Sequence, residues 1–243
     1  GDTVYFPRKM VEDNLKTVPS SFTMYARNPE KNVLIDTETT AYVGPYGSPF
    51  VTDMDKGRRR GTLEDFNNIV KICEVLGNID IQSHISCEPN DVEVKKRPNT
   101  MVYNTLKYSE KPLMGSVYGY ETSRQCIELA SIPFGGLNAI KEKPVISSIP
   151  CTLTPLSYDD NMLGAIMAYA EFGQPQLVNS LSIAGMTTPA TIAGLVSLQN
   201  AEVLAGIVLA QLVNPGAPIV YSASGSNGDM SNGALAIGSP EDA

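Results

Sequence analysis

Five short polar segments, each following a hydrophobic run, hold the side chains of this chain that could do chemistry. The segments are 83–90, 118–122, 150–157, 184–189 and 222–230. They are rich in hydroxyl, amide and tyrosine groups but poor in acids, bases and cations. Such a composition suits holding a small molecule more than extensive proton transfer. We therefore expect a small-molecule binding site, and no residue is singled out as catalytic.

The single histidine, His84, restricts the chemistry further. No site built on two or three imidazoles can exist within this chain, and a Ser–His–Asp triad would have to use His84. His84 and its near neighbour Gln82 lie at the carboxyl end of a strand-like run, where they can face a bound molecule. Two roles stay open for His84: a general base or ligand, and a residue that only hydrogen-bonds a neighbouring loop.

Two tyrosines, Tyr118 and Tyr120, share the second polar segment. An aromatic cage binds a quaternary ammonium group, which has no hydrogen bond to donate. The two rings are therefore candidate walls of such a cage, and packing beneath the loop is their alternative role. Glu121 can also meet a cation, although an acid in the first turn of a helix is its simpler role.

The last two segments offer hydrogen-bond donors and acceptors. Gly185 and Thr188 follow a strand-like run and open a helix, so the amides here are expected to hold an anion such as a carboxylate. Ser222, Ser224 and Asp229 belong to the densest polar group of the chain, for which a solvated loop is the alternative.

Composition excludes several classes of protein. The net charge of −8 and the pI near 4.7 argue against a nucleic-acid groove, which usually presents a basic face. The four cysteines contain no C-x-x-C pair, which disfavours zinc ribbons, thioredoxin-like chemistry and disulfide scaffolds. We expect reduced thiols in a cytoplasmic protein, and no metal site.

The longest apolar region, 191–213, is interrupted by Gln199, Glu202 and Gln211. Polar groups at the centre of a membrane span are costly. The sequence therefore predicts no membrane span here, but a helix buried on nearly every side within the fold.

Residues 1–60 differ from the rest and predict an N-terminal α+β segment. A short helix begins near Pro7, and residues 21–26 and 33–43 are rich in strand-forming side chains. Residues 56–61 form a basic connector, for which a solvated loop and a phosphate-binding loop are the two interpretations.

Residues 61–243 repeat a strand–helix pattern. A helix is expected from Leu63 to about Leu76, capped by Thr62. Strand-like runs follow at 79–84, 112–117, 145–149, 176–183 and 218–222, and helices near 98–108, 122–130, 158–172 and 189–213. The runs begin about 31 to 42 residues apart, the length of a βα unit, and predict a parallel sheet covered on both faces.

Two α/β folds accommodate five such units: an open doubly wound sheet and a TIM (β/α)₈ barrel. No run is followed by the G-x-G-x-x-G turn of a dinucleotide fold, and polar loops follow every run, which favours the barrel. Five strands cannot close an eight-stranded barrel, and Ser239 to Asp242 read as the start of another helix. Residues 61–243 are thus expected to be an incomplete barrel from a longer protein.

Six motifs spread over nearly the whole chain carry a family resemblance. They occupy 21–29, 185–194, 200–206, 211–222, 229–230 and 236–241. Together they resemble the trimethylamine methyltransferase (MttB) superfamily. The matching positions include Gly185, Thr188, Ser222, Ser224, Asp229 and Met230, which the resemblance implies are substrate-binding residues.

The resemblance implies a TIM barrel of nearly twice this length. Members move a methyl group from trimethylamine, or from a quaternary amine such as glycine betaine, to the Co(I) of a separate corrinoid protein. The corrinoid is carried by that partner, so no directly bound cofactor is implied. Trimethylamine enzymes of the family contain pyrrolysine, at a position that the resemblance puts beyond residue 243, and we favour the branch without it.

Two other classes of function compete with methyl transfer. One is a different TIM-barrel enzyme, either a lyase or a pterin-dependent methyltransferase, although a pterin site needs buried Asp and Asn at several strand ends. The other is a scaffold or docking domain without a complete active site. The sequence allows a homo-oligomer without defining its size.

Overall fold

The computed structural model describes residues 3–229, 231–236 and 238. The expected helix start at Ser239 therefore lies outside the described residues. The N-terminal segment contains helix α1 (Arg8–Leu15) and an antiparallel pair, β1 (Phe22–Met24) with β2 (Val33–Ile35), joined across a 3₁₀ turn at Pro29–Lys31. Strand β2 is shorter than the expected run 33–43.

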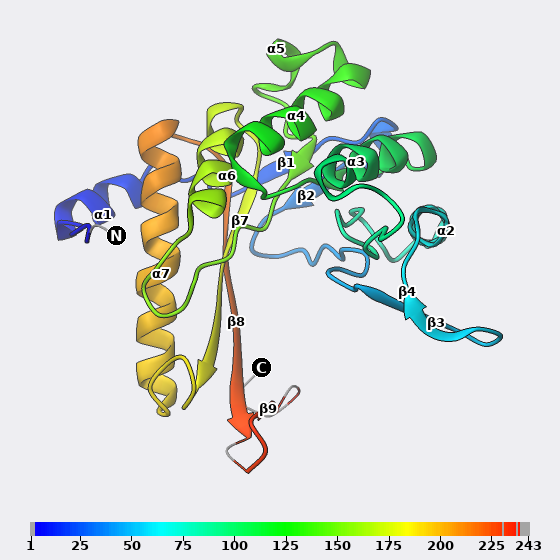
Figure 1. The fold of residues 1–243 in the computed structure, drawn as a ribbon. Helices are drawn as coiled ribbons and strands as arrows, with labels where there is room; N and C mark the ends of the chain where they lie inside the picture. The colour runs from blue at the N-terminus through cyan, green and yellow to red at the C-terminus, as the bar shows by residue number, and fades with distance from the viewer. Residues whose placement is uncertain (1–2, 230, 237, 239–243) are drawn as a thin grey trace.

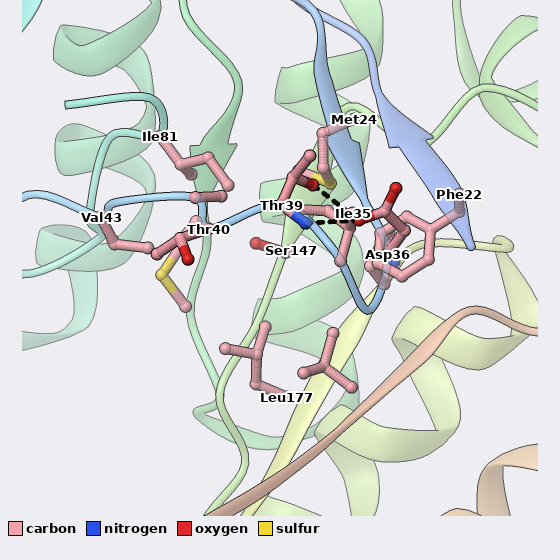
Figure 2. A pocket seen from close by; sticks show the side chains of 14 residues that line it. Phe22, Met24, Ile35, Asp36, Thr39, Thr40, Val43, Ile81, Ser147 and Leu177 are labelled. Carbon is pink, nitrogen blue, oxygen red and sulfur yellow. Dashed lines mark hydrogen bonds between the residues drawn. The ribbon is translucent and has the colours of Figure 1, made fainter. Parts of the chain in front are cut away.

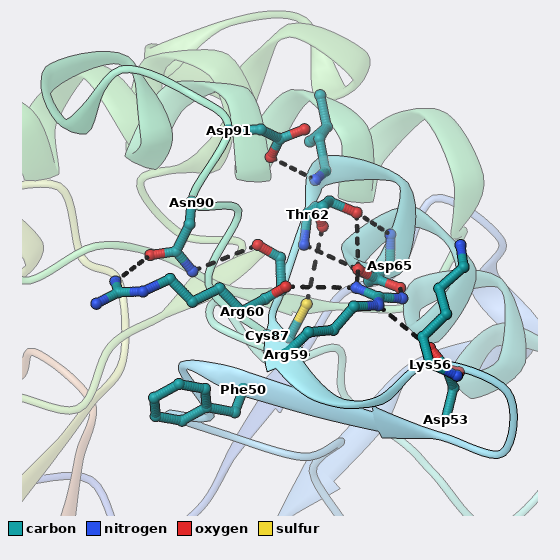
Figure 3. A network of polar contacts seen from close by, with 12 residues as sticks. Phe50, Asp53, Lys56, Arg59, Arg60, Thr62, Asp65, Cys87, Asn90 and Asp91 are labelled. Atoms are coloured by element: carbon teal, nitrogen blue, oxygen red, sulfur yellow. Dashed lines mark hydrogen bonds and ion pairs between the residues drawn. The ribbon is translucent and has the colours of Figure 1, made fainter.

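The basic connector is a strand and not a loop, although its side chains are largely exposed to solvent as the solvated interpretation expected. Residues Gly57–Arg60 form β4, which pairs antiparallel with β3 (Phe50–Asp53) in a hairpin (Figure 3). Asp53 closes the turn by accepting hydrogen bonds from the amides of Asp55 and Lys56. Arg59 reaches Asp53 from one side, which ties the two strands together.

Arg59 also fastens this hairpin to the next helix, α2 (Leu63–Val75). Its guanidinium holds both carboxylate oxygens of Asp65 at 2.6 and 2.8 Å (Figure 3). This pairing, followed by the bonds from Thr62, places the pKa of Asp65 well below its ordinary value. Thr62 and Asp65 form a capping box at the start of the helix, as the expected cap at Thr62 required.

The far end of α2 is closed by a buried lysine. The Nζ atom of Lys111 donates to the carbonyls of Cys73, Leu76 and Ile79 at 2.6 to 2.8 Å. A helix leaves its last carbonyls without partners in the helix, and a cation suits that end of its dipole. Lys111 thus fixes the exit of α2 toward the first strand of the sheet.

Four parallel strands form the centre of the chain, in the order in which they occur along it, and Figure 1 shows the two long ones running side by side. They are β5 (Leu113–Met114), β6 (Ile146–Ser147), β7 (Gln176–Ala184) and β8 (Ile219–Asp229). β5 pairs with β6, and β7 pairs with β8. A parallel bridge between Ser148 and Gln176 joins the two pairs into one array.

The array differs from expectation at both ends. The first expected run, 79–84, is present only as parallel bridges of Ile81 and Gln82 to their neighbours. At the other end, β8 does not stop at Ser222 but continues to Asp229, because β7 offers it paired residues up to Ala184. The polar segment 222–230 is thus largely strand, and β8 also pairs antiparallel with β9 (Ala234–Leu235).

The expected helices are present, and they pack in chain order. After α2 come α3 (Arg97–Tyr108), α4 (Gly119–Ser131), α6 (Asp160–Glu171) and α7 (Ile192–Val213); the short elements are 3₁₀ turns at Val94–Lys96 and Ile132–Phe134 and helix α5 (Leu137–Ile140). Each long helix contacts the next one along the chain. Because helices on opposite faces of a sheet do not touch, this helix layer covers one face of the sheet, which we call the outer face.

Helices α4 and α6 approach one another closely at Gly164. A Cβ placed on Gly164 would lie 2.5 Å from the backbone nitrogen of Tyr120, so only glycine fits. We expect Gly164→Ala to destabilise the protein by about 1–3 kcal/mol through overpacking. Urea denaturation measures this effect. Gly77→Ala is the control, since its Cβ would meet nothing within 4 Å, and equal stability of the two variants would contradict the prediction.

Helix α7 is the one helix among the described residues long and apolar enough to cross a membrane, with a mean hydropathy of 1.7 over its most apolar stretch. It packs against α1, α6, β7 and β8. Its first turns are open, with Ile192 60% and Val196 51% exposed, so burial on nearly every side is not observed. Further along, the buried polar side chains of Glu202 and Gln211 bond to neighbouring segments.

The β1–β2 hairpin covers the other face of the sheet, the inner face, at the amino ends of the strands. The backbone of Tyr25 bonds to Pro144 and that of Arg27 to Glu110, both just before strands. Between hairpin and sheet lies a cavity of about 320 Å³ (Figure 2). Side chains from the sheet that line it are Ile81, Met114, Ser147, Leu177 and Val220. They define which positions of each strand face inward.

Candidate active site

Alternation along β7 separates its side chains into two sets, since successive strand residues point to opposite faces. On the outer face, Gln176 donates to the carbonyl of Ile166 in α6, and Ser180 donates to Glu202 in α7. Leu177 lines the inner cavity, and Asn179 lies two residues further along the same face. The inner face therefore passes from apolar near the start of the strand to polar further along.

A polar cluster occupies this inner face beyond the cavity. Ser222 and Ser224 of β8 both donate to Oδ1 of Asn179, at 3.0 and 3.1 Å. The Nδ2 atom of Asn179 donates in turn to the Sγ of Cys151 at 3.5 Å. We call Cys151, Asn179, Ser222 and Ser224 the inner-face cluster. It presents hydroxyls and an amide from the interior of β7 and β8 and a thiol from the segment after β6, which suits hydrogen bonding to a small polar molecule.

Two of the predicted residues, Ser222 and Ser224, belong to this cluster, and the other members were missed. Asn179 lies within a run that is predicted as a hydrophobic strand, and a single amide in such a run does not indicate a binding site. The available signal was alternation, since Asn179 shares the face of Leu177 and pairs with Ser222 across the sheet. Cys151 is one of the four cysteines, for which the sequence predicts only reduced thiols.

His84 is buried, 3% exposed, and its Nδ1 atom has no hydrogen-bond partner. Burial lowers the pKa of the imidazole to about 4, so the ring is neutral at physiological pH. Gln82 is also buried and donates from Nε2 to the carbonyl of Val70 in α2 at 3.1 Å. Gln82 thus faces the helix layer, away from the inner-face cluster.

The two tyrosines have different surroundings. Tyr118 is 66% exposed at the start of α4. Tyr120 donates its hydroxyl to Glu171 of α6 at 2.6 Å, and this bond raises the pKa of the phenol. Tyr120 therefore contributes to helix packing, and the aromatic cage stays a prediction.

The loop from β7 to α7 uses its own amides. The amides of Met186, Thr187 and Thr188 all donate to the carbonyl of Ile183, and that of Gly185 donates to Thr188. Gly185 has a positive φ of 79°, which allows this tight turn. Because these four donors are engaged, they are not free to hold the anion expected there.

Asp229 lies at the far end of β8, away from the cluster. Its carboxylate accepts from the hydroxyl and amide of Ser231 and from Asn232. The hydroxyl of Ser231, above all, lowers the pKa of Asp229. Met230 lies outside the described residues. Within the part of the chain that the structure describes, no group of three or more His, Cys, Asp or Glu could hold a metal ion.

Comparison with known proteins identifies related sequences. The match to glycine betaine methyltransferase of Desulfitobacterium hafniense (strain Y51) is 47% identical over 241 residues, 99% of this chain and 50% of that protein. Proline betaine:corrinoid methyltransferase of Eubacterium limosum is 30% identical over 99% of this chain and 51% of its own length. Trimethylamine methyltransferase MttB of Desulfitobacterium hafniense (strain DSM 10664 / DCB-2) is 28% identical over 98% of this chain and 48% of its own length.

The chain thus spans about half the length of the curated relatives it matches. A family model described as trimethylamine methyltransferase (MTTB) matches residues 1–243, the full chain. Identity to several of its named members extends over the same range. The chain therefore belongs to the trimethylamine methyltransferase (MTTB) family.

Proposed function

We propose that this chain is one part of a TIM barrel about twice its length, which we call the complete protein. Parallel strands that follow one another in chain order, with helices that pack in the same order on one face, are the arrangement of a barrel wall. The relatives are twice as long. In this proposal residues 61–243 supply the first units of the wall, and residues 1–60 cover its amino end.

We propose further that the complete protein is a cytoplasmic methyltransferase that moves a methyl group from a methylated amine to the Co(I) of a corrinoid carried by a separate protein. Glycine betaine is the first candidate donor. The observation that carries this proposal is the 47% identity to a glycine betaine methyltransferase over 99% of the chain. The relatives named for proline betaine and trimethylamine are more distant, at 30% and 28%.

The proposed step is an in-line methyl transfer. For a quaternary donor such as glycine betaine, the bond between nitrogen and one methyl carbon breaks, and its electron pair stays on nitrogen, which leaves as a neutral tertiary amine. The cobalt supplies both electrons of the new Co–C bond and passes from Co(I) to methyl-Co(III). No proton moves in this step, so positioning of the donor supplies much of the rate.

The described residues suit such a step. The inner-face cluster offers neutral hydrogen-bonding groups, and the buried His84 is neutral. A donor with a polar end, such as a carboxylate, would be held by the hydroxyls of Ser222 and Ser224. Its methylated nitrogen needs only an apolar surround with no proton donor.

The direct test mixes the complete protein with its corrinoid partner reduced to Co(I) and follows the absorbance change of methyl-Co(III) formation. Glycine betaine, proline betaine, carnitine and trimethylamine are compared at equal concentration. We expect the fastest change with glycine betaine. Methylation from another donor of the panel would correct the substrate, and no change with any of them, with a partner shown to accept methyl groups, would contradict the function.

A further inference from the structure

A buried carboxylate connects three elements behind the inner-face cluster. Glu202 of α7 is only 2% exposed, and no cation pairs with it among the residues that the structure describes. Its Oε2 atom accepts hydrogen bonds from the hydroxyls of Thr152, Thr154 and Ser180, at 2.7, 2.9 and 2.6 Å. Its Oε1 atom accepts from the amide of Leu156 at 2.6 Å. Four donors thus satisfy one acceptor-only group.

Two of these donors are chain neighbours of the cluster. Thr152 directly follows Cys151, and Ser180 directly follows Asn179. The two segments are also joined by backbone bonds, from the amide of Thr152 to the carbonyl of Asn179 at 2.9 Å and from the amide of Asn179 to Pro150 at 3.0 Å. Because adjacent strand residues point to opposite faces, holding Thr152 and Ser180 outward aims Cys151 and Asn179 inward.

Packing alone does not call for a carboxylate at this position. An apolar side chain would fill the space without the cost of removing a charge from water. It could not, however, accept bonds from donors fixed on two neighbouring segments and on the loop that follows. The function that only Glu202 can serve here is to set the relative position of those segments.

We infer that Glu202 is a positioning residue for substrate binding, acting through Asn179 and Cys151. The expected effect of Glu202 on the rate rests on the proposed methyl transfer. The expected effect of Glu202 on the geometry of the cluster does not depend on that proposal. When the carboxylate is replaced, the loop 151–157 and β7 lose their common acceptor. Asn179 is then no longer fixed as the acceptor for Ser222 and Ser224.

The test compares Glu202→Gln with the parent in the complete protein by two measurements. The first is the rate at which iodoacetamide alkylates Cys151, resolved by peptide mass spectrometry without substrates; we expect it to rise several-fold as the loop opens. The second is kcat/KM for the methyl donor, which we expect to fall roughly 100-fold, the cost of about 1 Å of misplacement. Glu74→Gln is the control, because the carboxylate of Glu74 in α2 likewise accepts a serine hydroxyl and a backbone amide, from Ser109 and Glu110, and neither belongs to the cluster or to a predicted binding residue; it should change neither measurement.

Each outcome decides between the alternatives. Faster alkylation together with lower kcat/KM supports the inference. A lower melting temperature with kcat, KM and alkylation unchanged in the folded fraction assigns Glu202 to stability alone and overturns it. Faster alkylation while neither parent nor variant transfers a methyl group supports positioning and contradicts the proposed function. If Glu202→Gln does not fold, Thr152→Val and Ser180→Ala each remove one donor, and unchanged alkylation and kinetics in both would overturn the inference.

Discussion

Replacing Asn179 by alanine in the complete protein is expected to raise KM for the methyl donor by roughly 10- to 100-fold. The amide of Asn179 is the common partner of Ser222, Ser224 and Cys151. Its removal leaves two hydroxyls and a thiol without a fixed geometry at the proposed substrate-facing surface. Donor-concentration dependence of the methyl-Co(III) absorbance change measures the effect.

The control for this prediction lies on the same strand pair but on the outer face. Tyr221 precedes Ser222, and its hydroxyl donates to Asn200 of α7 at 3.3 Å. Tyr221→Phe removes a hydrogen bond of comparable size and should leave KM unchanged. A rise in KM that is equal in both variants would show a general loosening of β7 and β8, and would contradict an inner-face substrate site.

Acidification is expected to weaken the folded state through His84. In the folded chain burial lowers the pKa of His84 to about 4, against an ordinary value near 6.5 when unfolded. A lowered pKa means that the unfolded state binds the proton first. The stability that the neutral, buried His84 gives the folded state is therefore fully present above pH 6.5 and is lost as the pH falls from 6.5 towards 4. Because one proton binds per molecule, the free energy of unfolding falls by about 3 kcal/mol through this group.

A pH series of urea denaturation curves measures this loss. The informative quantity is the difference between the parent and His84→Gln, which has no imidazole to protonate, because other residues of the complete protein titrate equally in both. We expect the parent to lose about 3 kcal/mol more than the variant between pH 7 and pH 4. Parallel curves for the two proteins would contradict a buried neutral histidine.

Helices were the part of the fold most open to prediction, because their signals are local. Thr62 begins α2, and proline near position 98 begins α3, within a residue or two of the observed starts. The hairpin of β3 and β4 was misread because nothing local makes a run of arginines a strand. Its pairing depends on Arg59 meeting Asp53 and Asp65, which only the folded chain brings together.

The site was predictable only in part, for a related reason. Ser222 and Ser224 stand out as polar residues after a hydrophobic run, but the face to which they point follows from pairing with β7. Gln82 looks like an equally good candidate in sequence. In the structure, the alternation of side chains places Gln82 on the outer face, where its amide donates to a backbone carbonyl of α2.

The two faces of the sheet bond to different partners, and this difference bears on how sequences of this family can change. On the outer face, the side-chain amides of Gln82, Gln174 and Gln176 donate to backbone carbonyls of the helices. These bonds fix the position of the helices on the sheet. On the inner face, the hydroxyls of Ser222 and Ser224 bond instead to Asn179 of the neighbouring strand. Substitutions of these two serines therefore leave the bonds to the helix layer in place, so the proposed substrate-facing surface can change at little risk to folding. The relatives are named for four different methylated compounds: glycine betaine, proline betaine, carnitine and trimethylamine.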